Sequence, residues 1–111
     1  MIFGIGCDIV EISRIKLMLD THGDLFKRKV FTKMEISMEK GDLACYYANR
    51  FAAKEAYAKA VGVGISDLLS FKDIEILYDV RMKPYFSNAS KAHLSMSNDG
   101  GFAIAYVVIE G

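Results

Sequence analysis

The sequence predicts a single α+β domain, spanning residues 1–111, in which a strand and helices pack on a mainly antiparallel sheet. Three observations lead to this fold class. A β-branched and aromatic segment opens the chain, a long alanine-rich segment with helical character fills its middle, and several short strand-like segments close it. With 111 residues and no linker, repeat or low-complexity stretch, the chain has the size of one domain.

The first predicted element is a strand over Ile2–Val10. Because side chains alternate across a strand, Gly4, Gly6 and Asp8 lie on one face. Two glycines leave this face without side chains, so that a helix or a ligand can approach the backbone closely. The same face carries a carboxylate at Asp8.

Helices are predicted next. Ile12–Asp20 has apolar residues at helical spacing, and Thr32 followed three residues later by Glu35 is a capping-box signature for a short helix. The main helix begins after Asp42, a favourable N-cap residue, and ends at Gly62, a typical helix stop.

The last third of the chain is predicted to form strands, two of which are joined by a hairpin turn at residues 98–101, where the sequence reads NDGG. The predicted strands are Phe71–Tyr78, Tyr85–Phe86, Ala92–Ser97 and Phe102–Ile109.

Composition excludes several classes of protein. The chain is 52% hydrophobic and its 14 basic residues balance 14 acidic ones, which argues against disorder and against nucleic-acid binding. Its apolar opening stops at Asp8 and has no basic residues before it, so we expect neither a signal peptide nor a membrane span, and a cytoplasmic protein. Cys7 and Cys45, far apart in sequence, are expected to be free thiols.

A candidate site begins on the main helix. Helical periodicity places Glu55 in the middle of a stripe of small and apolar residues, where an unpaired carboxylate is unfavourable. One interpretation is an ordinary ion pair with Lys59, one turn later. The other is that Glu55 binds a cation together with a second ligand.

Asp8 is the candidate for that second ligand. Two carboxylates without a His or Cys cluster suit a hard cation such as Mg²⁺, which commonly completes its coordination with water and substrate phosphate. The alternative is that Asp8 caps a helix beginning near Ile9.

Basic residues could hold the phosphates of a substrate. Arg50 and Lys54 are one helical turn apart on a stripe next to Glu55, and Lys83 precedes the chain's only proline, Pro84. The alternative for each of these cations is a solvated surface position.

Two segments carry a family resemblance. GIGCDIVEISR at residues 4–14 and RFAAKEA at residues 50–56 together resemble the signature pair of the holo-[acyl-carrier-protein] synthases. Agreement in order and spacing continues through FKDIEI at 71–76, KPY at 83–85 and the closing residues 94–110. Nearly the whole chain is covered.

The resemblance implies a 4'-phosphopantetheinyl transferase fold and an enzyme of fatty acid biosynthesis. Such enzymes move the phosphopantetheine arm of coenzyme A to a serine of apo acyl carrier protein and release adenosine 3',5'-bisphosphate. It implies that Asp8 and Glu55 bind Mg²⁺ and act in catalysis, and that Lys59 neutralises or protonates the leaving phosphate. The positions implied to contact coenzyme A are Arg50, Lys54, Lys83 and Pro84, and Arg14 is implied to dock the carrier protein.

Small members of this family are homotrimers with the coenzyme A site between subunits, which gives a use for the surplus apolar residues. One departure stands out: many relatives have a histidine where this chain has Asn98, which cannot act as an acid or base near neutral pH. The alternative to an enzyme is therefore a catalytically silent trimeric module that keeps the fold and binds nucleotide or protein.

Overall fold

A three-stranded antiparallel sheet forms one side of the molecule. The computed structural model describes all residues 1–111. The sheet consists of β1 (Ile2–Glu11), β4 (Ala92–Asp99) and β5 (Phe102–Glu110) in the order β1-β5-β4, so the first and last strands of the chain pair. The predicted turn at residues 98–101 joins β4 to β5, and the α+β class is confirmed.

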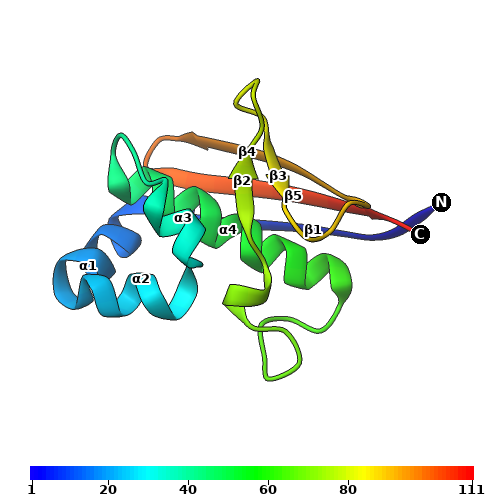
Figure 1. Cartoon of the computed structure of the whole chain (residues 1–111), viewed down its shortest axis with the longest axis horizontal. Helices are drawn as coiled ribbons and strands as arrows, with labels where there is room; N and C mark the ends of the chain where they lie inside the picture. The colour runs from blue at the N-terminus through cyan, green and yellow to red at the C-terminus, as the bar shows by residue number, and fades with distance from the viewer.

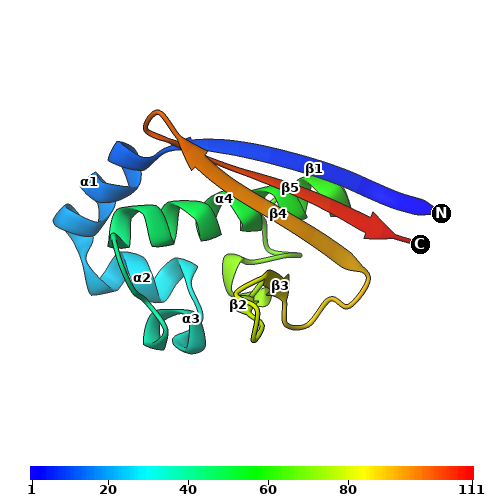
Figure 2. The same cartoon turned by 90° about the horizontal axis from the view of Figure 1, so that it is seen from above.

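The main helix α4 (Leu43–Val61) lies along one face of this sheet (Figures 1 and 2). Its ends are those predicted: the Asp42 side chain accepts a hydrogen bond from Cys45 N, and Gly62 ends the helix in a left-handed conformation. The helix approaches β1 so closely that a Cβ added to Gly6 would lie 2.0 Å from the carbonyl oxygen of Ala56. The glycine face of β1 therefore receives a helix.

The remaining elements are shorter and lie around α4. They are α1 (Ile12–His22), α2 (Asp24–Val30), α3 (Lys33–Ser37), the 3₁₀ turn η1 (Phe71–Asp73), and the hairpin strands β2 (Ile76–Tyr78) and β3 (Pro84–Phe86). The β2–β3 hairpin projects from the body of the molecule (Figure 1). The predicted capping box of α3 is present, with Thr32 Oγ1 accepting from Glu35 N at 3.1 Å.

The structure departs from the sequence analysis at three places: one helix that was not predicted, one predicted strand that is shorter, and one of the two alternatives for Asp8. Helix α2 is missing from the predicted elements because seven residues are too few for a clear helical pattern. The spacing of its two buried residues, Phe26 and Val30, by one turn is the signal that could have indicated it. The predicted strand over Phe71–Tyr78 is a strand only from Ile76, because the Asp73 carboxylate accepts from Ser70 N at 2.9 Å and closes a turn. Asp8 caps no helix, since β1 continues through it to Glu11.

The two faces of the sheet have opposite environments. Toward α4 lie buried residues such as Val10, Ala105 and Val107, and every helix and the hairpin lie on this side (Figure 2). On the opposite face, nothing covers a row of large apolar side chains from β1 and β5. They are Phe3, Ile5, Ile9, Phe102, Ile104 and Tyr106, between 36% and 68% exposed.

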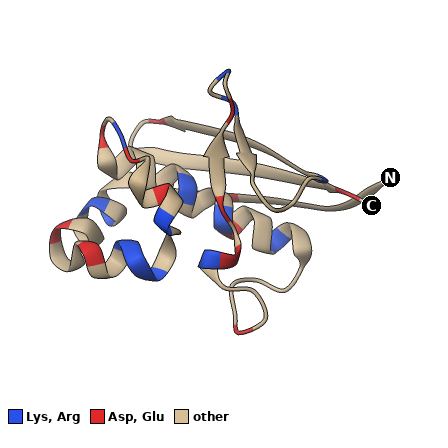
Figure 3. Cartoon of the chain, viewed as in Figure 1, with Lys and Arg blue, Asp and Glu red and all other residues tan.

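Charged residues occur only toward the ends of this open face, where Glu11 and Asp99 are the strand partners of Phe102. Most lie on the helices and the hairpin, and few on the sheet (Figure 3). A contiguous uncharged apolar face is unusual for a monomer and typical of a protein interface. Cys7, on the same face, and Cys45 are free thiols, as expected.

Candidate active site

The contact between α4 and β1 brings the predicted carboxylates together. Gly4 faces Ala60 and Gly6 faces Ala56, so the two elements run antiparallel. Two strand residues and four helix residues advance by similar lengths, about 6.6 and 6.0 Å. The next strand residue on this face is Asp8, and it therefore comes level with the turn of α4 that precedes Ala56, beside Glu55.

Lys59 joins the two elements. Its ammonium donates to Asp8 Oδ1 at 3.2 Å and to the carbonyl oxygen of Cys7 at 3.0 Å. The alternative of a Glu55–Lys59 ion pair is wrong, since Lys59 pairs with Asp8 and no cation lies within 4.0 Å of the Glu55 carboxylate.

Of Asp8, Glu55 and Lys59, Glu55 is the one whose charged form the surroundings disfavour. Partial burial raises the pKa of its carboxyl above the ordinary value of 4.5, and the Asp8 charge raises it further. Lys59 and Arg14 act in the opposite direction but do not cancel these effects. The Glu55 side chain makes no hydrogen bond to the rest of the chain, so an additional cation beside it would relieve both causes of the pKa shift.

The chemistry of these donors fits Mg²⁺. Asp8 and Glu55 supply carboxylate oxygens, and no cluster of three or more His, Cys, Asp or Glu side chains capable of holding a metal exists in the chain. A site with two protein carboxylates is typical of Mg²⁺, which completes its octahedral shell with water and phosphate oxygens. A tighter all-protein cage for Zn²⁺ or Ca²⁺ is not present.

Arg50 is a buried cation without a carboxylate partner. The residue is 2% exposed, and its guanidinium carbon lies over the rings of Tyr46, 3.6 Å from the ring centre, and Tyr78, 4.9 Å from the ring centre. Nη1 donates to the carbonyl oxygen of Tyr46, whereas Nε has no partner. A buried charge in this state favours the arrival of an anion. The two tyrosines were not predicted, although Tyr46 stands one turn before Arg50.

Lys54, which is also predicted to contact the nucleotide, has all three of its ammonium donors occupied within the chain. Lys54 is completely buried and forms an ion pair with Glu35 at 2.6 Å. Its other two hydrogen bonds go to the carbonyl oxygens of Val30 and Phe71. No ammonium hydrogen is left for a phosphate. Burial lowers the pKa of Lys54, and the neighbouring Glu35 opposes that shift.

Lys83 and Pro84 lie between the tip of the β2–β3 hairpin and β3, which begins at Pro84. Lys83 is exposed and its backbone N–H donates to Asp79 Oδ1 at 2.9 Å, which closes the turn. Both residues line a pocket of about 220 Å³ between this hairpin and the start of β4. They are accessible to a ligand but lie apart from Asp8.

Arg14 lies exposed on α1, close to the carboxylate group. Its guanidinium carbon is 5.7 Å from the centre of the Phe51 ring, a cation–π contact, and its charge lowers the pKa of Glu55. A partner that contacts Arg14 would therefore lie near the carboxylates.

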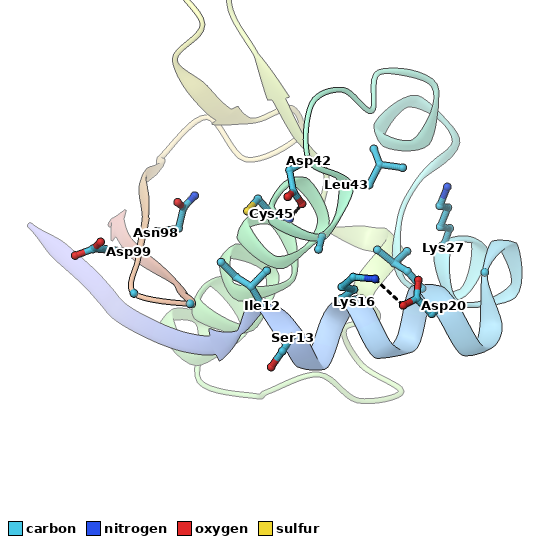
Figure 4. A pocket seen from close by; sticks show the side chains of 15 residues that line it. Ile12, Ser13, Lys16, Asp20, Lys27, Asp42, Leu43, Cys45, Asn98 and Asp99 are labelled. Atoms are coloured by element: carbon cyan, nitrogen blue, oxygen red, sulfur yellow. Dashed lines mark hydrogen bonds and ion pairs between the residues drawn. The ribbon is translucent and has the colours of Figure 1, made fainter.

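A large groove of the chain lies elsewhere. It has a volume of about 1080 Å³ and runs between α1, the first turn of α4 and the β4–β5 turn (Figure 4). Asn98 and Asp99 line it, together with the Lys16–Asp20 ion pair at 2.8 Å. None of the predicted metal, catalytic or nucleotide-binding residues lines this groove.

The candidate residues thus form two groups on different sides of α4. Glu55 follows Arg50 by five positions, which corresponds to about 140° around the helix axis and about 7.5 Å along it. Asp8, Glu55 and Lys59 form what we call the carboxylate half-site. Arg50 with its two tyrosines and the hairpin residues Lys83 and Pro84 form the cationic half-site.

Comparison with known proteins identifies the family. Residues 4–107 match the 4'-phosphopantetheinyl transferase superfamily. A holo-[acyl-carrier-protein] synthase of Bacillus cereus is 50% identical over 99% of this chain and 97% of its own length.

Two solved structures are closely similar. The holo-[acyl-carrier-protein] synthase of Neisseria meningitidis has a TM-score of 0.92 and 38% identity, covering all of both chains. That of Bacillus anthracis, in complex with CoA (3',5'-ADP), has a TM-score of 0.86 and 43% identity, covering 98% of this chain and 96% of its own. The chain belongs to the 4'-phosphopantetheinyl transferase superfamily and, within it, to the holo-[acyl-carrier-protein] synthases, which transfer the phosphopantetheine arm of coenzyme A to acyl carrier protein.

Proposed function

We propose that this chain performs its transfer with Mg²⁺ held by Asp8 and Glu55, in a site that two neighbouring subunits of a homotrimer complete. The observation that carries the metal assignment is the unpaired Glu55 carboxylate, level with Asp8 on the facing strand and raised in pKa by burial and by that neighbour. Bound there, Mg²⁺ would supply positive charge for the pyrophosphate of coenzyme A.

Each residue of the carboxylate half-site has its own role. Asp8 and Glu55 hold the cation and orient the attacking serine hydroxyl of the carrier protein or a water that accepts its proton. Lys59, already directed at Asp8, turns to the phosphate that leaves with adenosine 3',5'-bisphosphate and neutralises or protonates it. Positioning and charge stabilisation of this kind account for most of the catalysis in phosphoryl transfer.

The cationic half-site binds the nucleotide. Arg50, buried without a counterion, attracts a phosphate of coenzyme A, while Lys83 and Pro84 line the nucleotide from the hairpin. Because Arg50 and Glu55 face different sides of α4, the two half-sites of one chain do not enclose one ligand. The cationic half-site of one subunit therefore meets the carboxylate half-site of the next.

The open face of the sheet supplies the contact between subunits. Its uncharged apolar row on β1 and β5 is suited to burial against further copies of the same chain, and a closed symmetric ring covers it without leaving an exposed apolar edge. In the proposed trimer, each of the three subunit contacts brings together one carboxylate half-site and one cationic half-site.

Carrier protein binds beside Arg14, where an acidic surface would be attracted locally and in a salt-sensitive way.

No helix of the structure is both long and apolar enough to cross a membrane. We place the enzyme in the cytoplasm, where coenzyme A and the carrier protein are found together.

Mass spectrometry of an apo acyl carrier protein tests this function. The chain is incubated with coenzyme A and either Mg²⁺ or a chelator, with Glu55→Gln as the matched variant. We expect the carrier to gain the mass of phosphopantetheine only with Mg²⁺ and the parent chain. Nucleotide binding without any mass gain would identify a silent binding module, and full activity of Glu55→Gln would contradict the metal assignment.

A further inference from the structure

We propose that Glu35 is a positioning residue for Arg50: through two contacts it fixes both tyrosine rings that hold the Arg50 guanidinium, and so presets the nucleotide-binding half-site. Glu35 lies on α3, 15 residues before Arg50, and no carboxylate of the chain forms an ion pair with Arg50. Its influence on the guanidinium is therefore indirect. This inference rests on the proposed role of Arg50 in binding coenzyme A.

The Glu35 carboxylate is rigidly held inside the protein. The residue is completely buried, and its Oε1 accepts from Lys54 Nζ at 2.6 Å and from Thr32 N at 2.9 Å. Lys54 is also fully buried, and its two remaining ammonium hydrogens donate to backbone carbonyl oxygens. A buried carboxylate with a charged partner and additional donors has one well-defined orientation.

The first contact reaches Tyr46. Its hydroxyl donates to the main-chain carbonyl oxygen of Glu35 at 2.5 Å, and this hydrogen bond is buried. The Tyr46 ring is the nearer wall of the Arg50 guanidinium, at 3.6 Å, and the Tyr46 carbonyl accepts from Nη1. Anchoring the hydroxyl to α3 therefore sets the orientation of the ring against which Arg50 lies.

The second contact reaches the strand that carries Tyr78. Glu35 Oε2 accepts from Ile76 N at 3.0 Å, at the first residue of β2. Tyr78 is two residues further along, on the same face of that strand, and forms the outer wall of Arg50 at 4.9 Å. β2 has only three residues and pairs only with β3, so this anchor to α3 fixes its position relative to α4.

The consequence is a separation of binding from chemistry. If either tyrosine ring becomes mobile, the Arg50 guanidinium can adopt orientations in which it does not contact a phosphate. Binding then becomes weaker, because the guanidinium has to be ordered when the ligand binds. Neither contact touches Asp8, Glu55 or Lys59. Loss of the Glu35 carboxylate removes the Ile76 contact and the anchors to Thr32 and Lys54 that hold the main chain of Glu35 against Tyr46. It should therefore weaken nucleotide binding and raise the KM for coenzyme A, while the rate at saturating coenzyme A is kept.

Glu35→Gln is the principal variant. It preserves the volume of the side chain but offers an amide NH₂ group to either Lys54 or Ile76 N, both of which are donors. Val107→Ala, in the buried core of β5, is the control for lost stability, since it removes packing without touching the cationic half-site. Tyr46→Phe is a milder variant that removes only the hydroxyl donated to Glu35.

Calorimetric titration with adenosine 3',5'-bisphosphate and steady-state kinetics with coenzyme A and apo carrier protein give the readouts, at a temperature where each variant is folded. For Glu35→Gln we expect Kd and the KM for coenzyme A to rise about tenfold, with kcat and the KM for carrier within about twofold of the parent. Tyr46→Phe should shift the same two constants by about threefold, and Val107→Ala should shift neither.

Equal Kd values for the parent, Glu35→Gln and Tyr46→Phe would overturn the inference, as would a fall in kcat alone. If Glu35→Gln does not fold, Tyr46→Phe decides: a weaker Kd supports the inference and a parental Kd overturns it. Failure of the proposed function is distinct, because in that case the parent chain itself does not modify the carrier, whether or not it binds the bisphosphate.

Discussion

The ammonium of Lys59 lies 3.2 Å from Asp8 Oδ1, and this contact spans the junction between the main helix and the first strand. Lys59 is 54% exposed at its side chain, so the pair contributes only about 0–1 kcal/mol to stability. The fold therefore depends little on this contact, which leaves Lys59 free for the role in the reaction that we propose.

Substitution of Lys59 separates these two roles. Lys59→Met should lower kcat by about 100-fold or more, since a charge that stabilises the leaving phosphate is worth several kcal/mol, while the free energy of unfolding changes by less than about 1 kcal/mol. Lys59→Arg keeps the charge and should retain part of the activity. Transfer kinetics and denaturant titration measure the two effects, and a Lys59→Met enzyme with parental kcat would remove Lys59 from the mechanism.

Glu55 should make stability depend on pH in the direction opposite to that of most carboxylates. Its pKa is raised in the fold, so its favourable contribution is complete below the ordinary value of 4.5 and is lost as pH rises through the folded-state pKa. In metal-free buffer, Glu55→Gln should be more stable than the parent at pH 7 and lose this advantage below pH 4.5. Unfolding free energies across this range provide the check. A variant less stable than the parent at pH 7 would show that Glu55 is a structural acid.

Gly6 should be irreplaceable because it sets the distance between the carboxylates. A Cβ at this position would lie 2.0 Å from the Ala56 carbonyl oxygen, which is main chain and cannot turn away. Gly6→Ala should therefore destabilise the protein by about 3 kcal/mol and reduce transfer further by displacing α4 from β1. Gly111→Ala is the control, since its Cβ meets its nearest atom at an ordinary 3.5 Å. Parental stability of Gly6→Ala would refute the close approach.

The open sheet face should decide the oligomeric state. Ile5 is 68% exposed in the single chain, and Ile5→Lys would place a charge in the proposed subunit contact. Light scattering should give the mass of a trimer for the parent and of a monomer for Ile5→Lys, with transfer activity lost. Leu25→Lys, on the exposed side of α2, should remain a trimer. A monomeric parent chain with full activity would contradict the shared site.

Much of this arrangement could be predicted from the sequence because it depends on local signals. Period-two alternation placed Gly4, Gly6 and Asp8 on one face, and the Asp42 cap and Gly62 stop bounded the helix that packs there. The carboxylate half-site follows from these signals and from the family motifs.

What sequence could not predict depends on distant partners. Arg50 and Lys54 are one turn apart and look equivalent, but Lys54 meets Glu35, 19 residues earlier, whereas Arg50 meets two tyrosines. Helical periodicity cannot tell a cation in a core ion pair from a cation packed on aromatic rings, since the difference lies in which side chains of other elements reach each cation. The same reason applies to Glu35. The sequence predicts it as a capping residue, which it is, but does not indicate its contacts with Lys54 and Ile76.

Subunit complementation tests the central claim, that a site combines the carboxylate half-site of one chain with the cationic half-site of another. Glu55→Gln and Arg50→Ala chains, each inactive alone, are co-expressed in equal amounts and assayed by transfer to apo carrier protein. Random assembly leaves about a quarter of the sites with both halves intact, so activity should recover to about 25% of the parent. No recovery in mixed trimers of confirmed composition would show that both halves act within one chain and would contradict this account.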